Sequence, residues 1–94
     1  MIFEAYENKR AGETRDMGWN WAPVLSSAIN PADTIASAVV VATGVTITGD
    51  NHDATTNVFR ITGGTQNVEA TATSTVTTSS GEIFVGVHHI TITD

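Results

Sequence analysis

The chain has no cysteine, one leucine (Leu25), one lysine (Lys9) and two prolines among its 94 residues. The absence of cysteine excludes disulfides and metal sites with thiolate ligands. Leucine and lysine are strong helix formers, so their scarcity argues against a helical domain. A small chain without cross-links must gain its stability from packing or from partners.

Positive charge is also scarce, because four Lys and Arg residues stand against ten Asp and Glu residues, for a net charge of −6. Phosphate binding needs clustered basic side chains, so we expect contact neither with nucleic acid nor with anionic membranes. No apolar run approaches the length of a membrane span, and Glu4 and Glu7 stand where a signal peptide needs apolar residues. We therefore expect a chain that no signal peptide exports.

Threonine makes up about one residue in six, and Val and Ile are frequent. These residues favour a pleated, half-buried surface over a helix. The stretch 68–78 alternates small or apolar residues with Glu and Thr, which predicts a strand with one dry face. Ser79-Ser80-Gly81 supplies a turn in which Gly81 can take a positive φ, and Ile83–Thr93 returns as the partner strand. The sequence therefore predicts an all-β domain built around a long hairpin.

Further strands are predicted at 14–22, 35–42, 45–48 and 57–62, with a polar loop at 49–55. Pro23 and Pro31 bracket a turn or a loose helical turn. About seven short antiparallel strands separated by turns are typical of a β-sandwich. Its expected core residues are Met17, Trp19, Trp21, Ile35, Phe59, Ile61, Val68, Val76, Ile90 and Ile92.

The first residues differ from the rest, because charged side chains crowd them whereas Arg60 is the only basic residue beyond Asp16. This shift predicts an N-terminal arm at 1–13 and a sandwich at 14–94. The arm is either a frayed terminus or a segment that orders against a neighbouring subunit. Its aromatic residues, Phe3 and Tyr6, favour the second reading.

The last strand is apolar on both sides, since Ile83, Val85 and Val87 alternate with Phe84 and further inward-facing residues. Either a bulge at 86–89 exchanges the two faces, or a neighbouring protein covers the outer face. The sequence thus gives a set of candidate contact residues on the arm and on the last strand: Ile2, Phe3, Tyr6, Arg10, Arg15, Ile83, Val85 and Val87.

No enzyme, metal or cofactor site is predicted. His88 and His89 are adjacent on a strand, so their side chains point to opposite faces and cannot share one ion. The stretch 50–53 offers oxygen ligands but lacks the full spacing of a calcium loop. No Gly-x-Ser-x-Gly elbow and no carboxylate pair for acid–base work is present.

Five short motifs follow one another along the chain. They are Asp16-Met17-Gly18-Trp19-Asn20-Trp21, Asp33-Thr34-Ile35-Ala36-Ser37, Gly44-Val45-Thr46, Gly63-Gly64-Thr65 and Thr77-Thr78-Ser79-Ser80-Gly81. In this order and spacing, from Lys9 to the end, the chain resembles the bacteriophage fibre–tail adaptor proteins, a family of small virion proteins. It departs from them at Ala70, where members usually have tyrosine, and at Val40, where tryptophan is common.

The resemblance implies an immunoglobulin-like virion protein without catalytic residues, assembled in the host bacterial cytoplasm and present in several copies or as a homo-oligomeric ring. It would join the portal or connector, the tail or the fibres in the neck and tail assembly. Two other functions stay open. One is a capsid decoration protein, and the other is a carbohydrate-binding surface module that uses Trp19 and Trp21 as a stacking platform.

Tryptophan fluorescence separates core tryptophans from a sugar-binding platform. If both indoles lie in the core, we expect blue-shifted emission that added glycans do not move, because burial removes the rings from water. Red-shifted emission that glycans shift would instead support the carbohydrate-binding module.

Overall fold

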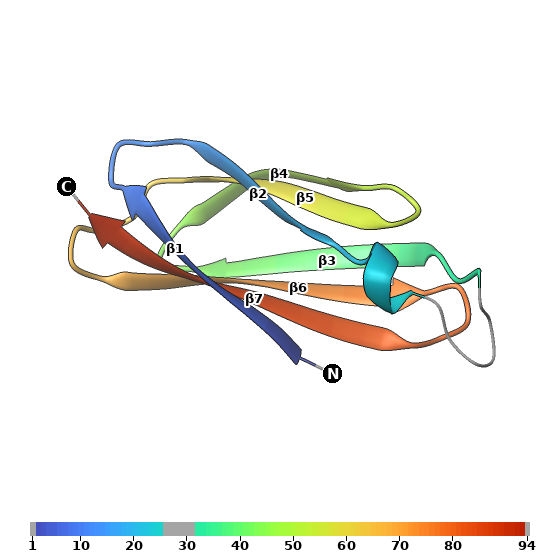
Figure 1. Cartoon of the computed structure of the whole chain (residues 1–94). Coiled ribbons are helices and arrows are strands. Elements are labelled where there is room, and N and C mark those ends of the chain that lie inside the picture. The colour runs from blue at the N-terminus through green and yellow to red at the C-terminus, as the bar shows by residue number, and fades with distance from the viewer. Residues whose placement is uncertain (1, 26–31, 94) are drawn as a thin grey trace.

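A computed structural model describes residues 2–25 and 32–93 as two β-sheets packed face to face (Figure 1). One sheet, here sheet A, has the strand order β1-β7-β6-β3, and the other, sheet B, has the order β2-β5-β4. The strands are β1 (Ile2–Arg10), β2 (Arg15–Asn20), β3 (Ile35–Thr43), β4 (Thr46–His52), β5 (Thr56–Thr62), β6 (Glu69–Thr78) and β7 (Ile83–Thr93). Within the described residues no helix is long and apolar enough to cross a membrane. The predicted all-β sandwich is confirmed.

The predicted N-terminal arm is wrong, because its residues form strand β1 at the edge of sheet A. β1 pairs with β7 along its whole length, from Ile2 opposite Val85 to Arg10 opposite Thr93. This pairing is parallel, which corrects the expectation of antiparallel strands throughout. The sequence concealed the strand because its inward positions include charged residues, which interrupt the apolar alternation that normally reveals a strand.

One predicted loop also differs from the structure. Most of the polar loop predicted at 49–55 belongs to β4, which pairs with β5 across a register shift between Ile47 and Gly49. Asp53 closes the hairpin by accepting the backbone N–H groups of Thr55 and Thr56 at 2.9 and 2.8 Å. The helical turn predicted near the prolines is present at Pro23, where Ala22–Val24 forms a 3₁₀ turn, and residues 26–31 lie outside the described part of the chain.

The core lies between the sheets and contains most of the residues expected there. Its two clusters consist of Met17, Phe59, Ile61, Ala70, Ala72, Ile90 and Ile92, and of Trp21, Leu25, Ile35, Val76 and Phe84. Trp19 is half-buried and packs against the second cluster. Val68 is 47% exposed and was wrongly placed in the core. It precedes β6 in a turn where Asn67 has a φ of 67°, so the inward alternation begins only at Ala70.

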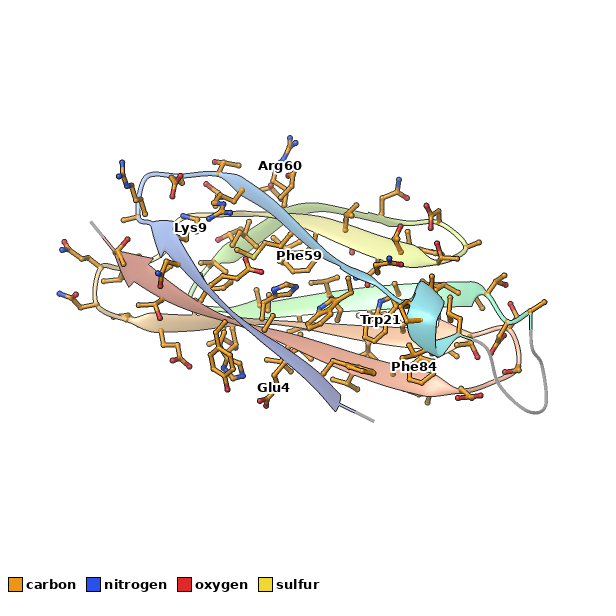
Figure 2. The ribbon with its side chains drawn as sticks, viewed as in Figure 1. Glu4, Lys9, Trp21, Phe59, Arg60 and Phe84 are labelled. Carbon is orange, nitrogen blue, oxygen red and sulfur yellow. The ribbon has the colours of Figure 1, made fainter. Side chains whose placement is uncertain are left out.

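A buried hydrogen-bond chain joins the two sheets beside the second cluster. The indole Nε1 of Trp21 donates to Asn57 Oδ1 at 2.5 Å, and Asn57 Nδ2 donates to Ser74 Oγ at 3.0 Å. Each of these residues is at most 1% exposed. Figure 2 shows Phe59 between the sheets, and Trp21 and Phe84 near the 3₁₀ turn. The bond chain fixes sheet B over sheet A, because groups buried this deeply cannot exchange a lost partner for solvent.

Replacing Asn57 with alanine should lower the free energy of unfolding by about 1–3 kcal/mol, because it leaves the buried indole N–H of Trp21 without an acceptor. Urea unfolding followed by tryptophan emission measures the change. The control Asn8→Ala alters an exposed side chain on β1 and should change stability by less than about 0.5 kcal/mol. Equal effects of both substitutions would contradict the structural role of the bond chain.

Candidate protein-contact surface

Uncharged β-branched side chains lie together on the outer face of sheet A. Cross-strand register places Val39, Thr75 and Val85 in one row. The next row holds Val41, Thr73 and Val87. Val39 and Val41 are 58% and 64% exposed. We call these two rows, together with Thr77 and Ile83, the outer patch.

Strand β7 has two apolar faces without any bulge. Its register is continuous with β1 from Val85 to Thr93 and with β6 from Ile83 to Thr91. The bulge predicted as one explanation of the doubly apolar strand is therefore wrong. Phe84, Gly86, His88, Ile90 and Ile92 are buried, whereas Ile83 on the opposite face is 58% exposed.

One end of the outer face is polar and aromatic. The Tyr6 ring stacks on His89, with centroids 4.7 Å apart and planes inclined by 12°. His89 lies between two carboxylates, with its Nδ1 3.5 Å from Glu69 Oε1 and its Nε2 3.7 Å from Glu4 Oε1. The negative charge of Glu4, and then its hydrogen bond with the phenol, raise the pKa of Tyr6. Tyr6 remains 74% exposed, so this end can offer a partner both a ring and charge.

The candidate contact residues from the first strand do not all lie on this face. Phe3 points inward, and its ring centroid lies 5.3 Å from that of Trp21, because side chains alternate along β1. Arg10 and Arg15 are exposed at the β1–β2 turn, where the Arg15 guanidinium donates to the Asn8 carbonyl at 2.9 Å. The side chain of Ile2 lies outside the described part of the structure. Tyr6 thus shares the outer face with Ile83, Val85 and Val87, whereas the two arginines form a separate site.

Charged side chains on the inner face of β1 attach this strand to the rest of the fold. His88 Nδ1 lies 2.9 Å from Glu7 Oε1, and His88 Nε2 lies 3.3 Å from the Gly18 carbonyl of sheet B. Lys9 is 1% exposed, and its ammonium donates to the Arg10 and Gly63 carbonyls at 2.8 and 2.7 Å. Figure 2 shows Lys9 near the β1–β2 turn. The sequence suggested no structural role for Glu7 and Lys9, because their partners lie far away along the chain.

The two tryptophans do not form a platform for sugars. Trp21 is 1% exposed and is bound to Asn57. Trp19 lies against Gly86, where an added Cβ would come within 2.5 Å of the indole, and its ring centroid is 4.7 Å from that of His88. The interpretation of these residues as an exposed stacking pair is therefore wrong.

Two hollows mark the surface of sheet B and the gap between the sheets. The larger, of about 470 Å³, lies beside Asp16, whose carboxylate takes two hydrogen bonds from Arg60 at 2.6 and 3.1 Å. The hydrogen bond with Arg60 lowers the pKa of Asp16. Figure 2 shows Arg60 pointing away from the sandwich. The smaller hollow, of about 260 Å³, lies between β3 and β4 and includes Val40. Within residues 2–25 and 32–93, no three His, Asp or Glu side chains converge as metal ligands.

Two of the sequence motifs meet at one end of the sandwich. Asp33 Oδ1 accepts the backbone N–H groups of Thr34 and Ser80 at 3.0 and 3.1 Å, and Asp33 Oδ2 accepts the Ser80 hydroxyl at 2.5 Å. Thr34 and Ser79 add a backbone bond of 2.8 Å and a contact between their hydroxyls of 2.8 Å. These bonds, here called the clasp, attach the segment before β3 to the β6–β7 turn. Both motifs therefore have a structural role.

Burial acts to raise the pKa of Asp33, but the hydrogen bonds outweigh burial, so this pKa lies below its usual value. Such a carboxylate stabilises the fold above its unfolded-state pKa of about 3.9, and the stabilisation is lost as pH falls through the lowered folded-state pKa.

Asp33→Asn should therefore lower the free energy of unfolding at neutral pH. It should also make this free energy fall less steeply as the pH is lowered. Urea unfolding between about pH 7 and about pH 2 measures both. Asp50→Asn, at an exposed carboxylate on β4, is the matched control. A D33N profile parallel to that of the unmodified chain would contradict the clasp.

Comparison with known proteins agrees with the motifs. Residues 9–91 match the model of the family Gp77, described as podophage GP4 fiber-tail adaptor protein gp77. No curated protein matches the chain. The match spans β2 to β7 and the motifs whose contacts are described above. The chain therefore belongs to the family of podophage GP4 fiber-tail adaptor proteins.

Proposed function

We propose that the chain is a virion adaptor of the neck and tail assembly, linking the tail or connector to fibres through protein–protein contacts. The family match over residues 9–91 carries this proposal. Several copies, or a homo-oligomeric ring, would assemble in the host cytoplasm. The proposal assigns no catalytic role to the chain.

The outer patch is the contact surface that best fits an adaptor. Contiguous apolar side chains that remain exposed commonly mark protein interfaces. Ile83 is 58% exposed, and its neighbours Val85 and Val87 are half-buried on the same face. Tyr6 and His89 add an aromatic and polar rim, which is the usual arrangement of an interface. Arg10 and Arg15 would serve a second contact at the β1–β2 turn.

The strand order supports an immunoglobulin-like module. In the constant-type immunoglobulin fold, strands B, E and D face strands G, F and C. Lettered in chain order from β2, this protein places β2-β5-β4 opposite β7-β6-β3. Strand β1 joins β7 instead of β2, so the first strand extends the sheet that carries the outer patch.

Capsid decoration is the second candidate function. The same exposed face would serve to bind a capsid surface, and the chain offers the same uncharged rows for that purpose. The two functions differ in location, since an adaptor lies at the tail and a decoration protein lies on the shell.

In images of purified virus particles, we expect density for the chain at the tail. Particles made with Ile83→Glu and Val85→Glu together should lose the chain or their fibres, because the substitutions put charge into the proposed interface. Val58→Glu, at an exposed position on sheet B, is the matched control and should leave assembly intact. Circular dichroism of each purified variant establishes folding. Absence of the chain from particles would refute a virion role, and density on the shell alone would favour decoration.

A further inference from the structure

The two sheets present four edge strands, and β3 differs from the other three. The order of the sheets makes β1, β3, β2 and β4 the edges of the described fold. Open edges tend to pair with other chains, and proteins normally prevent this with charged side chains or bulges. β1 carries Glu4, Glu7, Lys9 and Arg10, and β2 carries Arg15 and Asp16. β4 has a register shift between Ile47 and Gly49, followed by Asp50.

Strand β3 has no charged side chain, and its register shift, between Ile35 and Ser37, lies at its start. Its sequence, Ile-Ala-Ser-Ala-Val-Val-Val-Ala-Thr, contains no charge and no proline. Its pairing with β6 is regular from Ser37 to Thr43. In the part of the chain that the structure describes, no backbone hydrogen bond links Ser37–Thr43 to a strand other than β6. This stretch therefore presents its outer backbone groups as a template for one more strand.

The sequence of this edge is nearly the same in both directions. Around Val40, the flanking pairs are Val39 with Val41, Ala38 with Ala42, and Ser37 with Thr43. In an antiparallel pair, residues directly opposite one another point to the same face. A second copy related by a two-fold axis at Val40 would thus oppose valine with valine and alanine with alanine. Exposed positions would meet exposed positions, since Val39 and Val41 both lie on the outer face.

We infer that β3 is a self-association edge, on which a second copy of this chain adds its own β3 in antiparallel register centred on Val40. The pairing joins two four-stranded sheets into one continuous sheet and extends the outer patch across the two-fold axis. Such a contact is isologous, so one pairing satisfies the β3 edges of both copies.

Charge favours this edge over the others as the meeting point of two copies. Each chain carries a net charge of −6, so copies repel one another wherever acidic side chains face each other. β3 has no charged side chain of its own, although Asp50 of β4 lies in the hollow beside Val40, whereas β1, β2 and β4 each carry Glu or Asp side chains on the strand that would pair. One strand pairing buries less than the about 1,200 Å² of a standard interface. We therefore expect a reversible dimer that forms with rising concentration and strengthens with added salt, which screens the repulsion.

Sedimentation of the purified full chain, from micromolar to millimolar concentration, tests the association. Val41→Lys places two positive charges beside the axis and should weaken dimerisation at least about tenfold. Val58→Lys adds the same charge at an exposed position on β5, a central strand, and should leave dimerisation unchanged. A chain that stays monomeric at every concentration, or a dimer that resists V41K, overturns the inference. A monomer whose β3 edge binds only an extended segment of another virion protein overturns it too.

Disulfide trapping tests the register, because the chain has no cysteine of its own. In the inferred pairing, the two copies of residue 40 face each other with Cα atoms about 4.5–5.5 Å apart, within disulfide range. The two copies of residue 41 are separated by more than about 7 Å, too far for a bridge. Oxidation should therefore cross-link Val40→Cys about tenfold faster than Val41→Cys. Equal rates, or faster cross-linking of V41C, would overturn the register. These tests use the isolated chain, so their failure leaves the adaptor role untouched.

Discussion

The buried bond chain from Trp21 through Asn57 to Ser74 is the interaction on which the packing of the sandwich depends. Apolar residues alone could slide in a core made largely of Ala, Val and Ile, because their contacts have no direction. Hydrogen bonds between fully buried groups have one geometry that satisfies all partners. The bond chain therefore sets the position of sheet B over sheet A, and the aromatic rings of Trp21 and Phe84 stack beside it.

A second group of polar contacts brings the first strand into this framework. Glu7 pairs with His88 on the inner side, while the ammonium of Lys9 is held by two carbonyl oxygens. Inward-pointing charges of this kind also protect an edge from foreign strands. β1 thus completes sheet A and closes one of its edges, whereas the opposite edge, β3, keeps an uncharged backbone open to pairing.

The proposed contact surfaces follow from this asymmetry of sheet A. Its inner face is used by the core, and its outer face keeps Val39, Val41 and Ile83 exposed to water. Family membership associates such a domain with phage tails. The outer patch and the β3 edge meet along the same strand, so a second copy at β3 would enlarge the surface offered to a tail or fibre protein.

The sequence by itself determined the β class, the β6–β7 hairpin, the turn at Gly81 and most of the core, because a period of two needs only local information. It could not place Glu7, Lys9 or Val68. From sequence alone, a charged residue is predicted to be exposed, because its distant partner is not known. A valine is predicted to be buried, because the residue at which its strand begins is not known. The strand order, the continuous register of β7 and the open edge of β3 were decided only by tertiary structure, because pairing joins residues that are far apart in the chain.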